Sequence, residues 1–286
     1  MVKLLNQLAF QPGQISGQED SIILPLFKEL DIPHAISIGL QSQNMAQTFN
    51  HSLDDLEVRQ DKFLTKNNLE LLNKAYFSTV PTEKDTTIGD ISTPNNTLHP
   101  IVYPADVIFT HLSSTPLIHK PADCPTAIIF AKKNILPVLG LAHLGRPQVN
   151  KKVTEQAIDH VTDFYMINPR DIFIGISPSI GPKHYFIKKK DQEVHHFIDR
   201  SYWGEFAWED ASYDEPIIRI DVLGKILSVI KQKGVPDENI EAYGHSDAVD
   251  TYHLASLTPP LAFSHRYATE TNQPHKNGRF MVAAQL

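Results

Sequence analysis

Three short apolar runs follow one another in the middle of the chain and limit the folds that it can adopt. They read "ADVIFTHL" (105–112), "CPTAIIFA" (124–131) and "ILPVLGLAHLG" (135–145), and all three are rich in large aliphatic residues. Runs of this kind are typical of strands that are buried on both faces of a sheet. The sequence therefore predicts a sheet whose centre is formed by these segments.

Strand-like and helix-like segments alternate along the rest of the chain. We expect further strands at "AISIGL" (35–40), "AYFSTV" (75–80), "DIFIGISPSIG" (171–181), "NIEAYGHS" (239–246) and "LAFSHRYA" (261–268). Apolar residues at intervals of three and four predict helices over 54–75, 150–167 and 219–235, the last with Gly234 as a C-terminal cap. The polar stretch 81–100 is expected to be a long surface connection, and "FIKKKD" (186–191) a solvated loop.

No segment repeats and no Ser/Gly linker divides the chain. We therefore predict an α/β protein with a single domain over residues 1–286, built from mixed β-sheets flanked by helices. A chain of 286 residues can bury a large core without disulfides, and its one cysteine, Cys124, cannot form an internal bridge. A lone thiol is typical of a reducing compartment, so we expect a cytoplasmic protein.

Two classes of partner are excluded by the composition. The N-terminal apolar run is too weak for a signal peptide, and no later segment is long enough to span a bilayer, so we expect no membrane association. The net charge is −7, which argues against a nucleic-acid partner, because such proteins normally present a basic face. Nothing in the sequence indicates the oligomeric state.

Cys124 and His143 are the first candidates for chemistry. They stand at the start of one predicted strand and at the end of the next, so a β-hairpin would bring them together. A thiolate and an imidazole could ligate zinc, which usually needs at least three protein ligands, or act as a nucleophile and its base. The alternative is that Cys124 is a small core residue and that His143 bonds a backbone carbonyl.

Charged residues near these two suggest an anionic ligand. Arg146 follows His143 closely, and a guanidinium offers phosphate a planar fork of donors. "FSHRY" and "NGRF" add His265, Arg266 and Arg279, which could equally be surface residues. Asp123 could orient a histidine or a ligand hydroxyl, or bond its own backbone in a turn.

Four blocks, in order, resemble those of the YfiH-type laccase-domain family. They are "PADCPTAIIF", "LAHLGRP", "GISPSIGPKHYFI" and "LAFSHRYATETNQPHKNGRFMVAAQL", which resemble TADC-P, AHAGWRG, GPAIGPCCYEV and FFSxRRD followed by TGRM. The segment "NHSLDDLEVRQDKFL" also resembles that family's NLG-DDPE-V-NR-L. The resemblance implies a layered α/β/β/α sandwich.

The resemblance also implies an activity. The family is described as multicopper polyphenol oxidase, but its better-supported chemistry is on purine nucleosides: phosphorolysis, adenosine deamination and methylthioadenosine cleavage around zinc. The family's zinc ligands are the histidine of a QVHG motif, the cysteine of ADC and the histidine of AHAGW, so Cys124 and His143 are implied as two metal ligands. The implied function is a zinc-dependent purine nucleoside enzyme that uses phosphate, with Arg146 and Arg266 binding the anion.

Several positions depart from the family pattern. Pro81 stands opposite the QVHG histidine and cannot ligate a metal, so either His99, His111 or His119 completes the site, or zinc binds weakly or not at all. The early arginine and glycine loop is replaced by "SIGLQSQNMAQTF", and Lys183 and His184 replace the GPCC cysteines. Two alternatives therefore stay open: a catalytically degenerate member acting as a binding or regulatory protein, and a metal-free cysteine hydrolase using Cys124 and His143.

Overall fold

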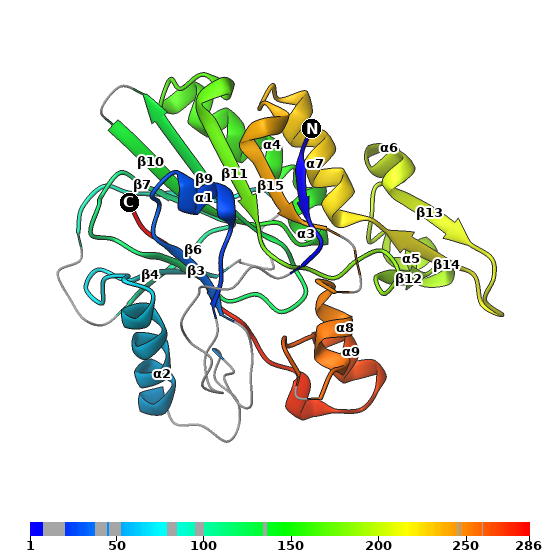
Figure 1. Cartoon of the computed structure of the whole chain (residues 1–286). Coiled ribbons are helices and arrows are strands. Elements are labelled where there is room, and N and C mark those ends of the chain that lie inside the picture. The colour runs from blue at the N-terminus through cyan, green and yellow to red at the C-terminus, as the bar shows by residue number, and fades with distance from the viewer. Residues whose placement is uncertain are drawn as a thin grey trace.

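The chain folds around two large sheets, seen in the computed structural model (Figure 1). The structure describes residues 1–7, 21–37, 45, 53–78, 85–94, 100–133, 136–244, 246, 248–258 and 260–286. The seven-stranded sheet has the order β1 (Lys3–Leu5), β15 (Ile240–Tyr243), β11 (Ile172–Ile176), β9 (Thr126–Lys133), β10 (Leu136–His143), β7 (Val107–Thr110) and β5 (Ile88–Ile91). As predicted, the three central runs are neighbours in this sheet.

The second large sheet has six strands and the third has three. The six-stranded sheet has the order β2 (Ser21–Ile22), β3 (His34–Ser37), β16 (Val282–Ala284), β8 (Leu117–His119), β4 (Ala75–Ser78) and β6 (Ile101–Pro104). The small sheet has the order β12 (Phe186–Lys188), β14 (Ile217–Ile220) and β13 (Ala207–Asp210). Parallel and antiparallel pairs occur in both large sheets, which confirms the predicted mixed topology.

The helices of the described part of the chain are distributed around the sheets. Those in the first half of the chain are α1 (Pro25–Glu29), α2 (Leu53–Lys66), α3 (Arg146–Asn150) and α4 (Val153–Asp159), which continues as a π-helical turn over His160–Phe164. Those in the second half are α5 (Lys189–His195), α6 (Arg200–Trp203), α7 (Val222–Gln232), α8 (Thr251–Ser256) and α9 (His265–Glu270). Short 3-10 turns occur at Pro169–Asp171, Gly204–Phe206, Asp237–Asn239 and Pro274–Lys276.

Alternation along the strands produces three buried layers. In β9, Ala127 and Ile129 pack toward α4 and α7, whereas Ile128 packs into the layer between the two large sheets. In β8, Leu117 lies in that same inter-sheet layer, and Ile118 packs in a third cluster with residues of α2. The layers thus follow the order helix, sheet, sheet, helix. Helices α4 and α7 lie on the outer face of the seven-stranded sheet, and α2 lies on the outer face of the six-stranded sheet (Figure 1). The predicted layered arrangement is confirmed.

Some predicted elements have other bounds. The helix expected over 54–75 ends at Lys66, because Asn68 and Asn73 adopt left-handed backbone conformations with φ of 57° and 59°. The helix expected over 150–167 is interrupted at Lys152, which has φ of 60° and precedes α4. Gly234, with φ of 85°, follows the end of α7 as predicted.

Three segments were predicted with the wrong structure. "LAFSHRYA" contains helix α9 and no strand, because the Ser264 hydroxyl accepts a bond from the backbone N–H of Tyr267 and caps a helix. The connection expected over 81–100 contains β5, and its residues 81–84 and 95–99 lie outside the described residues. The expected loop "FIKKKD" holds β12 and begins α5, although Lys188 and Lys190 remain exposed and pair with Glu215.

Within the described ranges, every helix is too short or too polar to cross a bilayer.

Candidate functional site

The predicted hairpin brings Cys124 and His143 to the same end of the seven-stranded sheet. Strands β9 and β10 are antiparallel, and His143 lies opposite Thr126, two residues after Cys124. Leu139 and Leu141 point into the inter-sheet layer, so the alternation of β10 directs His143 to that layer as well. The hairpin prediction is therefore confirmed.

Gly145 makes room for the two side chains. A Cβ atom at this position would lie 2.8 Å from Sγ of Cys124 and 3.1 Å from Nε2 of His143. Its backbone has φ of −63°, which any residue adopts, so the requirement for glycine here is steric. The thiol and the imidazole therefore border one small space that a side chain at 145 would fill.

His119 reaches the same place from the other sheet. It ends β8, is 6% exposed, and its ring centroid lies 4.7 Å from that of His143. The Phe77 ring stacks on the His119 ring at 4.6 Å, and Nδ1 of His119 lies 2.7 Å from Oγ1 of Thr126. The bond at Nδ1 fixes the ring and leaves Nε2 for a ligand.

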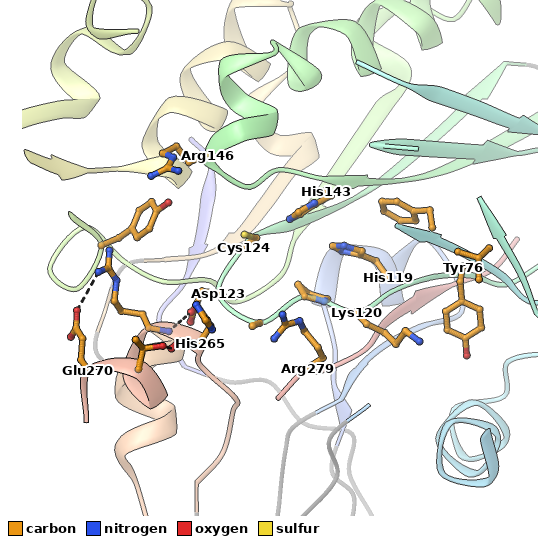
Figure 2. Close-up of a pocket in the computed structure, with 17 residues that line it drawn as sticks. Tyr76, His119, Lys120, Asp123, Cys124, His143, Arg146, His265, Glu270 and Arg279 are labelled. Carbon is orange, nitrogen blue, oxygen red and sulfur yellow. Dashed lines mark hydrogen bonds and ion pairs between the residues drawn. The ribbon is translucent and has the colours of Figure 1, made fainter. Parts of the chain in front are cut away.

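These residues line a cavity of about 810 Å³ (Figure 2). Its aromatic residues are Tyr76, Phe77 and Tyr185. Its cations are Lys120, Arg146, Arg266 and Arg279, its carboxylates are Asp123 and Glu270, and its other ionisable side chains are Cys124, His119, His143 and His265. All seven residues predicted from the sequence for catalysis, substrate binding or metal ligation therefore line one cavity.

Burial keeps the thiol and the imidazoles neutral. It raises the pKa of Cys124 to about 12, with a further contribution from Asp123 that Arg279 and Arg146 only partly offset. It lowers the pKa of His143 to about 4, and it lowers the pKa of His119 well below its usual value, where the His143 imidazole adds to the effect. A metal-free Cys124 is thus a thiol at neutral pH, which is the opposite of the activated thiolate that a cysteine hydrolase needs.

Asp123 holds the loop before Cys124 in place. Its Oδ1 accepts a bond from the Thr251 hydroxyl at 2.9 Å, and its Oδ2 accepts one from the Arg266 backbone N–H at 2.9 Å. Burial raises the pKa of its carboxyl, and these hydrogen bonds oppose that shift. Asp123 therefore ties the loop that carries Cys124 to helices α8 and α9.

The guanidinium groups of Arg266 and Arg146 differ in how many contacts they make with other protein groups. Arg266 lies 3.3 Å from a Glu270 carboxylate oxygen, donates to the Phe186 carbonyl, and stacks over the rings of Tyr185 and Phe186. Arg146 packs over the Phe197 ring at 4.8 Å, and its Nε is buried without a hydrogen-bond partner. An unsatisfied donor in a cavity wall favours Arg146 as an anion ligand.

Two further predicted residues lie at the C-terminal side of the cavity. His265 is exposed at the start of α9, where its Nδ1 lies 3.3 Å from Oδ1 of Asn277. Arg279 donates from a guanidinium nitrogen to the Gly278 carbonyl at 2.9 Å. Both residues come from the segment that precedes β16, so this segment forms one wall of the cavity.

The residues at which the sequence departs from the family pattern, and the histidines that could replace the missing ligand, differ in their position relative to the cavity. His111 is exposed and does not line the cavity, whereas His119 does. Pro81, His99 and most of the segment "SIGLQSQNMAQTF" lie outside the described residues. His184 is stacked on Tyr252 beside Asp250, away from the cavity lining.

Lys120 also lines the cavity, although it belongs to none of the sequence motifs. Its Nζ lies 4.4 Å from the centroid of the Tyr76 ring, and burial lowers its pKa to about 8. Its only signal in the sequence is its place next to His119, just after a short apolar run.

The side chains of Cys124, His143 and His119 are of the types that bind a borderline metal ion. One sulfur and two imidazole nitrogens suit zinc, and Nδ1 of His143 is buried without a hydrogen-bond partner. As placed, however, no three His, Cys, Asp or Glu side chains in the described part of the chain are grouped closely enough to enclose an ion.

Comparison with known proteins gives the same fold. Residues 39–286 match the family described as multi-copper polyphenol oxidoreductase laccase. The hypothetical protein YfiH of Bacillus licheniformis is 16% identical with a TM-score of 0.72, over 97% of this chain and 98% of that one. YlmD of Geobacillus stearothermophilus is 18% identical with a TM-score of 0.71 over the same shares.

A third solved structure, protein NMB0706 of Neisseria meningitidis, is 12% identical with a TM-score of 0.62 over 98% of this chain and 99% of that one. Among curated proteins, none matches significantly.

Proposed function

Since this chain belongs to the multi-copper polyphenol oxidoreductase laccase family, we propose that its cavity is the active site of a zinc-dependent purine nucleoside enzyme. The observation that supports the proposal is that Cys124, His143 and His119 line one cavity, which is also lined by four cations. The proposed reaction is phosphorolysis of adenosine or inosine, or deamination of adenosine, in the cytoplasm.

Cys124, His143 and His119 would hold the zinc. His119 takes the place of the ligand that the family supplies from the position of Pro81 here, and the bond of its Nδ1 to Thr126 orients the ring for ligation through Nε2. A bound zinc supplies Lewis-acid chemistry and lowers the pKa of a bound water.

The other cavity residues bind and orient. Arg146 lines the cavity, and its guanidinium group would bind phosphate. Arg266 is held rigid by Glu270 and the Phe186 carbonyl, so its charge stays at one place in the cavity. Phe77 and Tyr185 offer aromatic faces to a purine. Asp123 positions Cys124 through Thr251 and Arg266.

The test is metal content per chain, measured by elemental analysis of protein purified without chelator. We expect near-stoichiometric zinc in the wild type, and loss of zinc in Cys124→Ser, His143→Ala and His119→Ala. His111→Ala is the matched control, because His111 is exposed and outside the cavity. Retained zinc in Cys124→Ser would reject the ligand assignment, and zinc lost from His111→Ala as well would reject the assignment of His119.

Phosphorolysis of adenosine and inosine by the same proteins then tests the reaction. Turnover should follow zinc content across the variants. A zinc-loaded protein that turns over neither nucleoside, by phosphorolysis or by deamination, would favour the second candidate, a family member that binds without catalysis. The replacement of the family's histidine by Pro81 is the observation behind that candidate.

A further inference from the structure

One end of the cavity holds a lysine that the proposed reaction does not use. Lys120 follows the last residue of β8, lines the cavity, and places its Nζ 4.4 Å from the centroid of the Tyr76 ring. Figure 2 shows Lys120 and Tyr76 on one side of Cys124, and Arg146 and Glu270 on the other. The ammonium group therefore lies at the opposite end of the cavity from the proposed phosphate ligand Arg146.

The Tyr76 ring is a fixed platform for this ammonium group. Tyr76 is 3% exposed, and its hydroxyl donates to Oε1 of Gln60 at 2.5 Å. The Gln60 amide in turn donates to the Met45 carbonyl at 2.9 Å. Because the cation–π contact is to a ring that cannot turn away, Lys120 loses little further freedom when it binds a ligand.

The two carboxylates of the cavity are not partners of Lys120. Glu270 lies 3.3 Å from Arg266, and Asp123 accepts bonds from Thr251 and from the Arg266 backbone, so both cavity carboxylates lie on the α8 and α9 side. No carboxylate in the described part of the chain pairs with Lys120. A partly buried cation without a counter-charge is unfavourable by itself, and an anion in the cavity would relieve that penalty.

Arg279 adds a second cation to the same end. It lines the cavity, and Figure 2 shows it between Asp123 and Lys120. We propose that Lys120 and Arg279 form an oxyanion subsite, specific for a phosphate group, at the Tyr76 end of the cavity. An ammonium point charge and a guanidinium fork together suit the several oxygens of a phosphate.

The phosphate has two possible sources, which share this chemistry. It is either the 5′-phosphate of a nucleoside monophosphate or free inorganic phosphate. The subsite shares its cavity with the proposed enzyme but requires neither zinc nor turnover. Its success or failure is therefore separable from that of the proposed function.

The experiment is calorimetric titration of chelator-treated protein with inorganic phosphate, adenosine 5′-monophosphate and adenosine. We expect Lys120→Met to weaken binding of at least one of the two anions by about tenfold or more, because a hydrogen bond to a charged group is lost. Adenosine binding should be unchanged. Lys120→Arg should restore much of the anion affinity, and the control Lys132→Met, an exposed lysine at the far end of β9, should bind like the wild type.

The three titrations also identify the source. Weaker monophosphate binding with unchanged inorganic phosphate binding assigns the subsite to a phosphate carried by the ligand, and the reverse assigns it to free phosphate. Unchanged binding of both anions by Lys120→Met would overturn the proposal.

Thermal unfolding separates this role from a structural one. Because Lys120 has no carboxylate partner among the described residues, Lys120→Met should keep or raise the unfolding midpoint. A lowered midpoint together with equal losses for adenosine and both anions would show that Lys120 supports the fold, and would also overturn the subsite.

Discussion

The imidazole rings of His119 and His143 lie 4.7 Å apart between centroids, although they end strands of two different sheets. His143 is placed by the β9–β10 hairpin, and His119 by the pairing of β8 with β4 and β16. Both face the layer between the sheets, which also contains Phe77. The candidate metal site is therefore a product of sheet packing, and changes that disturb the packing beside it should disturb metal binding.

Gly145→Ala should empty the metal site while the protein still folds. The added Cβ would lie 2.8 Å from Sγ of Cys124 and 3.0 Å from Oε1 of Gln148, so these side chains must move. We expect loss of bound zinc and a decrease in the free energy of unfolding of about 1–3 kcal/mol, typical of overpacking. Gly89→Ala is the control, because its nearest neighbours would be 3.6 Å away. Full zinc content in Gly145→Ala would show that the space is not used by a metal.

Cys124 should react slowly with iodoacetamide in folded, chelator-treated protein. Burial and Asp123 raise its pKa to about 12, so almost no thiolate is present at pH 8. The measurement is the alkylation rate at pH 8, compared with the same protein unfolded in urea, where the thiol has an ordinary pKa. Alkylation that is faster in the folded protein would instead support the metal-free hydrolase.

The protein should lose stability as the pH falls below about 6.5. His34 accepts a bond from the Leu24 N–H at its Nε2 while its Nδ1 lies 2.8 Å from the Ile32 carbonyl, so the folded state holds it neutral, and burial lowers its pKa. The unfolded state then binds more protons at acid pH, and the stability present above pH 6.5 declines.

His34→Gln tests this assignment, because glutamine can accept and donate in a similar way but does not titrate. The free energy of unfolding in urea, measured at pH 7 and pH 5, should fall less in His34→Gln than in the wild type. Some decline should remain, because burial also lowers the pKa of His119 and His143. Equal declines in the two proteins would remove His34 as a cause.

Asp123→Ala should destabilise the fold and lower zinc content together. It removes the acceptor for the Thr251 hydroxyl and the Arg266 N–H, and we expect a loss of about 2 kcal/mol or more in unfolding free energy. Asp199→Ala removes an exposed cap from α6 and should lower the stability less than Asp123→Ala does, without affecting zinc. A stable, zinc-loaded Asp123→Ala protein without activity would instead make Asp123 a catalytic group.

Arg146→Ala should raise the Michaelis constant for phosphate about tenfold or more, since a charged donor to the anion is lost. The Michaelis constant for the nucleoside should change little. Steady-state phosphorolysis with each substrate varied in turn gives both values, and Arg170→Ala, an exposed arginine outside the cavity, is the control. A change confined to the nucleoside would contradict the anion role.

The wrong predictions share a physical cause. "LAFSHRYA" has the composition of a strand, but the Ser264 hydroxyl and the Asp123 carboxylate, which is distant in sequence, both accept backbone N–H groups that a helix start leaves unpaired. Likewise, the helix predicted over 54–75 is periodic in sequence, yet it ends at Lys66, before the left-handed Asn68. Local pattern indicates which segments can pair or coil, and tertiary partners decide where they stop.

The central strands and the proximity of Cys124 to His143 follow from local sequence, because a hairpin between adjacent strands fixes its own register. The packing of the whole chain places His119, and not His111, beside His143 and pairs Glu270 with Arg266. It also places Lys120 in the cavity wall without a carboxylate partner among the described residues. These relationships join segments from different sheets and helices. Their geometry depends on how buried faces pack against one another, and the spacing of residues within one segment does not determine that packing.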